Sequence, residues 1–140
     1  MRTACGAFAV VMLALALGAC GESSEDKAQA TICDARADIG KQVDTLTSLT
    51  AATVTKDAVT QSVDAIKKDL SDISSAQEDL SSDRRSEVEA ANKAFKSSVQ
   101  GITSQVLVSL SASDAKAAAA TALGQLKTSY QTAFAPLNCD

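Results

Sequence analysis

Apolar residues recur at steps of three and four along almost the whole chain from Lys27 onward. Between residues 59 and 80 these steps alternate in register, with only Gln77 interrupting, a pattern typical of the seam between packed helices. Stretches with the same period cover residues 32–49, 88–110 and 115–134. A chain patterned in this way buries its apolar side chains by packing amphipathic helices together, so we expect an all-α fold.

Breaks in this pattern mark the expected turns between helices. Thr55 is a suitable N-cap for the second helix, and Ser82 or Asp83 for the third. Residues 111–114, Ser-Ala-Ser-Asp, fit a capping box in which an acidic residue follows a serine by three positions. Pro136 ends the last helix because proline cannot continue a helical hydrogen-bond ladder.

Four helices of similar length with short connections predict a compact, antiparallel, up-down-up-down four-helix bundle over residues 28–140. We expect Tyr130 to be a core residue with its hydroxyl at the edge of the core, and close helix–helix approach at Gly101 and Gly124. The alternative is an elongated three-helix form with one continuous central helix from about residue 55 to 109, against which the first and last helices fold back.

The chain has four cysteines, and their positions separate them into two groups. Cys5 and Cys20 belong to an apolar N-terminal stretch, which leaves Cys33 and Cys139 for the folded part. An antiparallel four-helix bundle brings the end of its last helix back to the start of its first. We therefore expect a structural disulfide between Cys33 and Cys139, with two free buried thiols or a redox pair as the alternatives.

The first twenty residues are organised like a secretory signal peptide. Arg2 gives a positively charged start, and residues 4–20 contain no charged side chain. This apolar stretch is shorter than the ~20 strongly apolar residues that a membrane-spanning helix needs, so we prefer a signal peptide to a permanent anchor.

The end of this stretch, Leu17-Gly18-Ala19-Cys20, resembles the lipobox of bacterial lipoproteins: an aliphatic residue, two small residues and a cysteine. The resemblance covers residues 1–20 only. It implies cleavage between Ala19 and Cys20, which removes residues 1–19. It also implies a diacylglyceryl group on the Cys20 thiol, whose acyl chains, such as palmitate, form the membrane anchor. Two acyl chains are sufficient for stable membrane attachment.

The segment that follows the lipobox cysteine is polar and contains no apolar side chain up to Asp26. We therefore expect residues 20–27 to form the lipidated cysteine and a flexible tether. The signal and lipobox imply a location on the extracytoplasmic side of the cell membrane. Since Gly21, and not aspartate, follows the cysteine, we expect the outer membrane if the host has two membranes.

Composition limits the chemistry that the folded part can perform. The 121 residues from Cys20 onward contain no histidine or tryptophan and carry a net charge of −5, which argues against a nucleic-acid partner. Without histidine the commonest general base and metal ligand is missing, so we expect no catalytic site, no metal and no cofactor. A serine–lysine pair is conceivable with four lysines, but the sequence distinguishes no nucleophile: Lys67, Lys68, Lys93 and Lys96.

Carboxylate pairs also occur at helical spacing, and we interpret them as solvated surface: Asp34 with Asp38, Asp69 with Asp72, and Asp79 with Asp83. Three functions fit these observations. We prefer a non-enzymatic interaction module that is tethered to the membrane and binds another protein of the cell envelope. The alternatives are a carrier or sensor of an apolar small molecule bound within the bundle, beside the Ala-rich start of the last helix, and a passive envelope spacer, which the elongated form would favour.

Overall fold

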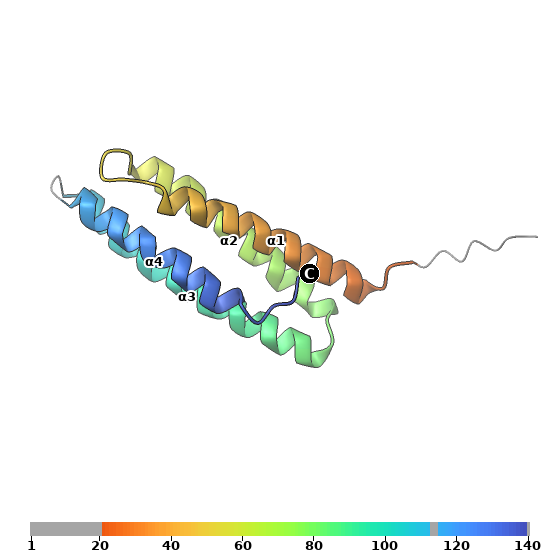
Figure 1. The fold of residues 1–140 in the computed structure, drawn as a ribbon. Helices are drawn as coiled ribbons and strands as arrows, with labels where there is room; N and C mark the ends of the chain where they lie inside the picture. The colour runs from red at the N-terminus through yellow and green to blue at the C-terminus, as the bar shows by residue number, and fades with distance from the viewer. Residues whose placement is uncertain (1–20, 113–114, 140) are drawn as a thin grey trace, which may run out of the picture.

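The computed structural model describes residues 21–112 and 115–139 and contains four long helices that pack side by side (Figure 1). They are α1 (Ser24–Thr47), α2 (Lys56–Ala76), α3 (Ser82–Leu110) and α4 (Lys116–Phe134). Each helix runs antiparallel to the one before it, and α1 and α3 each pack against both α2 and α4. The predicted four-helix bundle is confirmed. The elongated alternative is wrong, because the chain reverses between α2 and α3.

This reversal uses no glycine or proline. After α2 the chain forms one short 3₁₀ turn, η1 (Gln77–Asp79), and then becomes extended at Leu80, whose side chain is buried in the core. The Arg85 guanidinium donates to the backbone carbonyls of Glu78 and Leu80 and so satisfies carbonyl groups that the helix end leaves free. Ser81 occupies the N-cap of α3, so the expected capping residues Ser82 and Asp83 already lie inside the helix.

Helix α1 begins earlier than the sequence led us to expect. Ser23 and Asp26 form a reciprocal capping box, in which the Asp26 N–H donates to Ser23 Oγ at 3.1 Å and the Ser23 N–H donates to Asp26 Oδ2 at 3.2 Å. Residues 24–27, which we assigned to the tether, therefore form the first turn of α1. Of the residues described, only 21–23 precede the helix.

The same capping box affects the titration of Asp26. The hydrogen bond from the Ser23 hydroxyl, followed by the one from the Ser23 backbone, lowers the pKa of the Asp26 carboxyl. A carboxyl with a lowered pKa in the folded state contributes stability above its unfolded pKa, and this contribution disappears as the pH falls through the lowered value. The start of α1 is therefore held most firmly at neutral pH.

Two predicted caps lie at the end of the bundle opposite the chain ends, where α1 is connected to α2 and α3 to α4. One of them is confirmed and the other is wrong. Thr55 caps α2, accepting a hydrogen bond from the Ala58 N–H at 3.2 Å, and Val54 beside it is fully buried. The capping box expected over residues 111–114 is not found: Ser111 is the C-cap of α3 and its hydroxyl donates to the Leu107 carbonyl at 3.0 Å. Ser113 and Asp114 lie outside the described residues.

The core follows the apolar stripes, and three aromatic rings meet within it. Phe95 of α3 makes edge contacts with Tyr130 and Phe134 of α4, with ring centroids 5.7 and 5.4 Å apart. Phe95 and Phe134 are almost completely buried, whereas Tyr130 is only partly buried, at the edge of the core. This contact joins α3 and α4 in the half of the bundle that also holds the chain ends.

Candidate functional site

The predicted lipidation and cleavage positions, Cys20 and Ala19, lie outside the described residues, and their roles stay predictions. Gly21 is the first residue that the structure describes, and α1 begins three residues later. Over residues 21–112 and 115–139, no helix is both long enough and apolar enough to cross a membrane.

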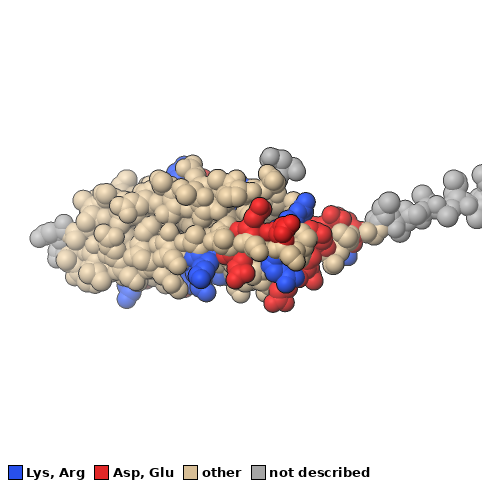
Figure 2. All heavy atoms as spheres, turned by 90° about the horizontal axis from the view of Figure 1, so that it is seen from below, with Lys and Arg blue, Asp and Glu red and all other residues tan. Residues whose placement is uncertain are grey.

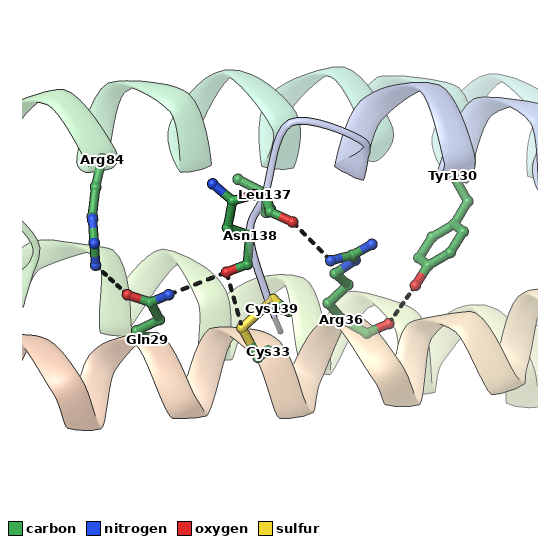
Figure 3. The surroundings of a disulfide bond; sticks show 8 residues. All are labelled: Gln29, Cys33, Arg36, Arg84, Tyr130, Leu137, Asn138 and Cys139. Atoms are coloured by element: carbon green, nitrogen blue, oxygen red, sulfur yellow. Dashed lines mark hydrogen bonds between the residues drawn. A yellow bond between two sulfur atoms is a disulfide. The ribbon is translucent and has the colours of Figure 1, made fainter.

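The predicted partners Cys33 and Cys139 lie at disulfide distance, with their sulfur atoms 2.11 Å and their Cα atoms 5.5 Å apart (Figure 3). Cys33 is on the third turn of α1, and Cys139 follows α4 at the other end of the folded chain. Because α4 runs back toward the start of α1, the two residues meet without any change in the helices. The antiparallel topology of the bundle therefore accounts for the proximity of Cys33 and Cys139.

Residues 136–139 form a strap that crosses from α4 to α1, and the disulfide, two hydrogen bonds and one buried side chain hold it in place (Figure 3). Arg36 Nη1 donates to the Leu137 carbonyl at 2.9 Å, and Gln29 Nε2 donates to the Asn138 carbonyl at 3.1 Å. The Leu137 side chain is buried and lines a cavity of about 70 Å³ between α1 and α3. The strap therefore lies against the apolar core at the end where the chain enters the bundle.

The same face of α1 explains one glycine. The Tyr130 hydroxyl donates to the Arg36 carbonyl at 2.8 Å, which confirms that its polar end lies at the edge of the core. The Tyr130 ring lies over Gly40, where an added Cβ atom would be only 3.0 Å from the hydroxyl oxygen. Gly40 therefore provides the close approach that the tyrosine needs.

Of the acidic pairs that the sequence singled out, Asp34 with Asp38 and Asp79 with Asp83 are exposed, whereas Asp69 and Asp72 are half-buried. Lys41 contacts Asp38 at 2.6 Å and Lys68 contacts Asp72 at 2.7 Å, within α1 and α2 respectively. Partial burial, followed by the nearby Asp38 carboxylate, raises the pKa of Asp69. Among the residues that the structure describes, no group of three or more acidic, cysteine or histidine side chains is arranged to hold a metal ion.

Charge is divided unevenly along the bundle. Every charged residue of α3 precedes Ser97, and α4 contains only two, Lys116 and Lys127. Figure 2 shows acidic side chains gathered toward the end where the chain enters, and a broad area with few charges beyond them. We give the name uncharged surface to a set of exposed residues on α3 after Lys96 and on α4 before Lys127: Ser97, Gly101, Ser104 and Val108 on α3, and Ala117, Thr121 and Gly124 on α4.

The two glycines of the uncharged surface contradict our expectation of close packing within the chain. Both Gly101 and Gly124 are exposed, and a Cβ atom added to either would meet nothing within 4 Å. The sequence already carried this signal, since the apolar stripe of α3 through Phe95, Val99 and Ile102 places position 101 on the opposite side. These glycines therefore do no packing within the bundle itself.

We expect Gly101→Ala and Gly124→Ala each to raise the free energy of unfolding by about 1 kcal/mol, because alanine favours the helix and neither position is crowded. Gly40→Ala is the matched comparison, since the same gain in helix propensity is opposed there by the contact with Tyr130. Urea denaturation of the three variants measures this difference. A gain at Gly40 equal to that at the other two positions would contradict the role assigned to Gly40.

Comparisons of the chain with protein-family models, with curated proteins and with solved structures found no match.

Proposed function

We propose that this protein is a bacterial lipoprotein, anchored through Cys20 on the extracytoplasmic side of a membrane, whose helical bundle binds another protein of the cell envelope without catalysing a reaction. The observation that carries the proposal is the uncharged surface on α3 and α4. It belongs to a chain whose residues from Cys20 onward carry a net charge of −5. Protein interfaces are depleted of charged residues at their centres, and burying such a surface costs little desolvation.

The glycines favour a helix as the element of the partner that docks. Gly101 lies nine residues before the end of α3 and Gly124 eight residues after the start of α4, so the antiparallel pair carries them at similar heights. Without Cβ atoms, both positions allow another backbone to come close. Val108 adds an apolar contact, because its side chain is 73% exposed. We infer a partner that presents an uncharged, amphipathic helix.

The other two functions considered from the sequence have less support. A carrier of an apolar molecule would place it beside the Ala-rich start of α4, but Ala119 and Ala122 there are buried in the hydrophobic core. A passive spacer was favoured by the elongated form. Because the chain forms a compact bundle, this support is lost. The interaction module is therefore the function that we propose.

Site-specific photo-crosslinking in the native envelope tests the interaction. A photoreactive residue at Thr121 should yield one crosslinked product of defined mass, and the crosslinked position in the partner should lie on an uncharged helix face. The same residue at Gln61, which is exposed on α2, is the control. Adding Gly124→Arg should remove the Thr121 product, because a charged side chain would then be buried in the interface. Equal products from both positions, or none from Thr121, would overturn the proposal.

The membrane anchor is tested separately. Cys20→Ala removes the thiol that would carry the lipid, so we expect the variant to lose its acyl modification and to be released from the membrane fraction or mislocalised. Metabolic labelling with a fatty acid and cell fractionation measure these two effects. If the variant remains uncleaved and bound to the membrane, residues 1–20 act as a plain anchor and the lipoprotein assignment is wrong.

A further inference from the structure

A groove of about 280 Å³ lies between α2 and α3. We call it the α2–α3 groove and define it by the residues that line it: Lys67, Leu70, Ser71 and Ser74 on α2, and Lys96, Val99 and Gln100 on α3. Leu70 and Val99 are 3% and 1% exposed and form an apolar floor. Its volume is close to the lower limit for pockets that hold small molecules.

The polar groups of the groove are hydrogen-bond donors or can act as donors, and no carboxylate lines it. Asn92, only 6% exposed, donates through Nδ2 to Ser74 Oγ at 2.7 Å and to the Leu70 carbonyl at 3.0 Å. Ser74 Oγ therefore acts as an acceptor toward Asn92, and its own proton remains available for a further acceptor. Asn92 thus fixes the Ser74 side chain in the groove wall.

Two lysines add positive charge from opposite walls of the groove. Lys67 comes from α2 and Lys96 from α3. The Lys67 ammonium lies 3.3 Å from Asp64, but the two side chains are 58% and 62% exposed, so solvent screens this pair strongly. In a chain with more acidic than basic residues, this groove gathers cationic and neutral donors around an apolar floor.

We propose that the α2–α3 groove binds a small organic anion, with a carboxylate or phosphate group between Lys67 and Lys96 and a short apolar part on Leu70 and Val99. Ser71 and Ser74 line the same groove as Lys67 and Lys96. These two lysines are among the four that the sequence offered as partners for a serine nucleophile. A lysine can act as a general base when it is buried, because burial favours its neutral form. The Lys67 side chain is instead largely exposed, which suits the binding of an anion. The proposal of an anion site does not rest on the proposed protein partner.

Titration of the purified full chain with four probes tests the proposal, with backbone amide shifts as the readout. Hexanoate and hexyl phosphate carry both an anionic and an apolar part, whereas hexanol has no charge and inorganic phosphate has no apolar part. We expect saturable shifts at residues 67–74 and 96–100 with the first two probes. Hexanol should give none, and inorganic phosphate should bind more weakly than hexyl phosphate. The tighter of the two hexyl anions identifies carboxylate or phosphate as the preferred group.

Matched lysine variants show whether the groove itself is responsible. Lys67→Gln and Lys96→Gln should each weaken the binding of the hexyl anions about fivefold, since each removes one charged, partly exposed donor. Lys41→Gln is the control: Lys41 pairs with Asp38 three residues earlier on α1, as Lys67 does with Asp64 on α2, but lies outside the groove. Unchanged amide spectra of the free variants verify that the bundle is intact.

Four outcomes would overturn the inference. Absence of saturable shifts at the groove residues excludes a site there. Hexanol binding as tightly as hexanoate excludes an anion site, and inorganic phosphate binding as tightly as hexyl phosphate excludes a role for Leu70 and Val99. An equal loss of affinity in Lys41→Gln shows that general surface charge, not the groove, attracts the probes.

Discussion

The double variant Cys33→Ala/Cys139→Ala will unfold with a free energy about 4–5 kcal/mol below that of the native chain, because a bond across 106 residues restricts the unfolded chain strongly. For a domain of this size, that loss lowers the melting temperature by roughly 15 °C. Thermal and urea denaturation measured by circular dichroism, with and without reductant, provide the test.

The reduced native chain is the internal control for this prediction. Reductant should bring it to the stability of the double variant and leave the variant itself unchanged. The helix content at low temperature should be retained in both, since the core residues and the strap contacts through Arg36 and Gln29 remain. A loss below about 1 kcal/mol would mean that these noncovalent contacts already hold the strap, and that the chain-entropy argument fails here.

Phe95→Ala is expected to cost about 3–5 kcal/mol, the usual range for removing a buried aromatic side chain. Phe95 is fully buried, and its ring contacts both Tyr130 and Phe134, so its removal leaves a cavity where α3 meets α4. Urea denaturation measures the loss, and the slope of the transition should stay constant if both states keep their compactness.

Val108→Ala, on the same helix, is the matched control for Phe95→Ala. Because Val108 is largely exposed, its substitution should change the free energy of unfolding by less than about 0.5 kcal/mol. Equal losses for the two variants would contradict the assignment of the core. A small loss for Phe95→Ala alone would show that Tyr130 and Phe134 can move to fill the space.

The helices and the bundle could be predicted from the sequence because a strong apolar period leaves few ways to bury the same residues. The Cys33–Cys139 proximity followed from the same topology. The start of α1 was missed although Ser23 and Asp26 fit a capping box, since the polar composition of the segment was given more weight than its local hydrogen bonds. Here composition was the weaker guide.

Other features depend on contacts that residue types do not reveal. The strap is held by backbone carbonyls of Leu137 and Asn138, and any residue supplies a carbonyl. The turn between α2 and α3 depends on the burial of Leu80 and on Arg85, which acts across several residues. The α2–α3 groove was equally invisible, because its lysines and serines lie on two helices whose relative rotation only packing determines.

The strap also decides how the molecule would respond to force. The Cys33–Cys139 bond closes residues 33–139 into a covalent ring, and the segment before Cys33 lies outside it. A pull between position 20 and Cys139 can therefore extend no more than the thirteen residues up to Cys33, about 45 Å of contour length. Tension on the segment before Cys33 would unfold the first turns of α1 and would then act on the disulfide bond. The ring would then carry the load as one mechanical unit.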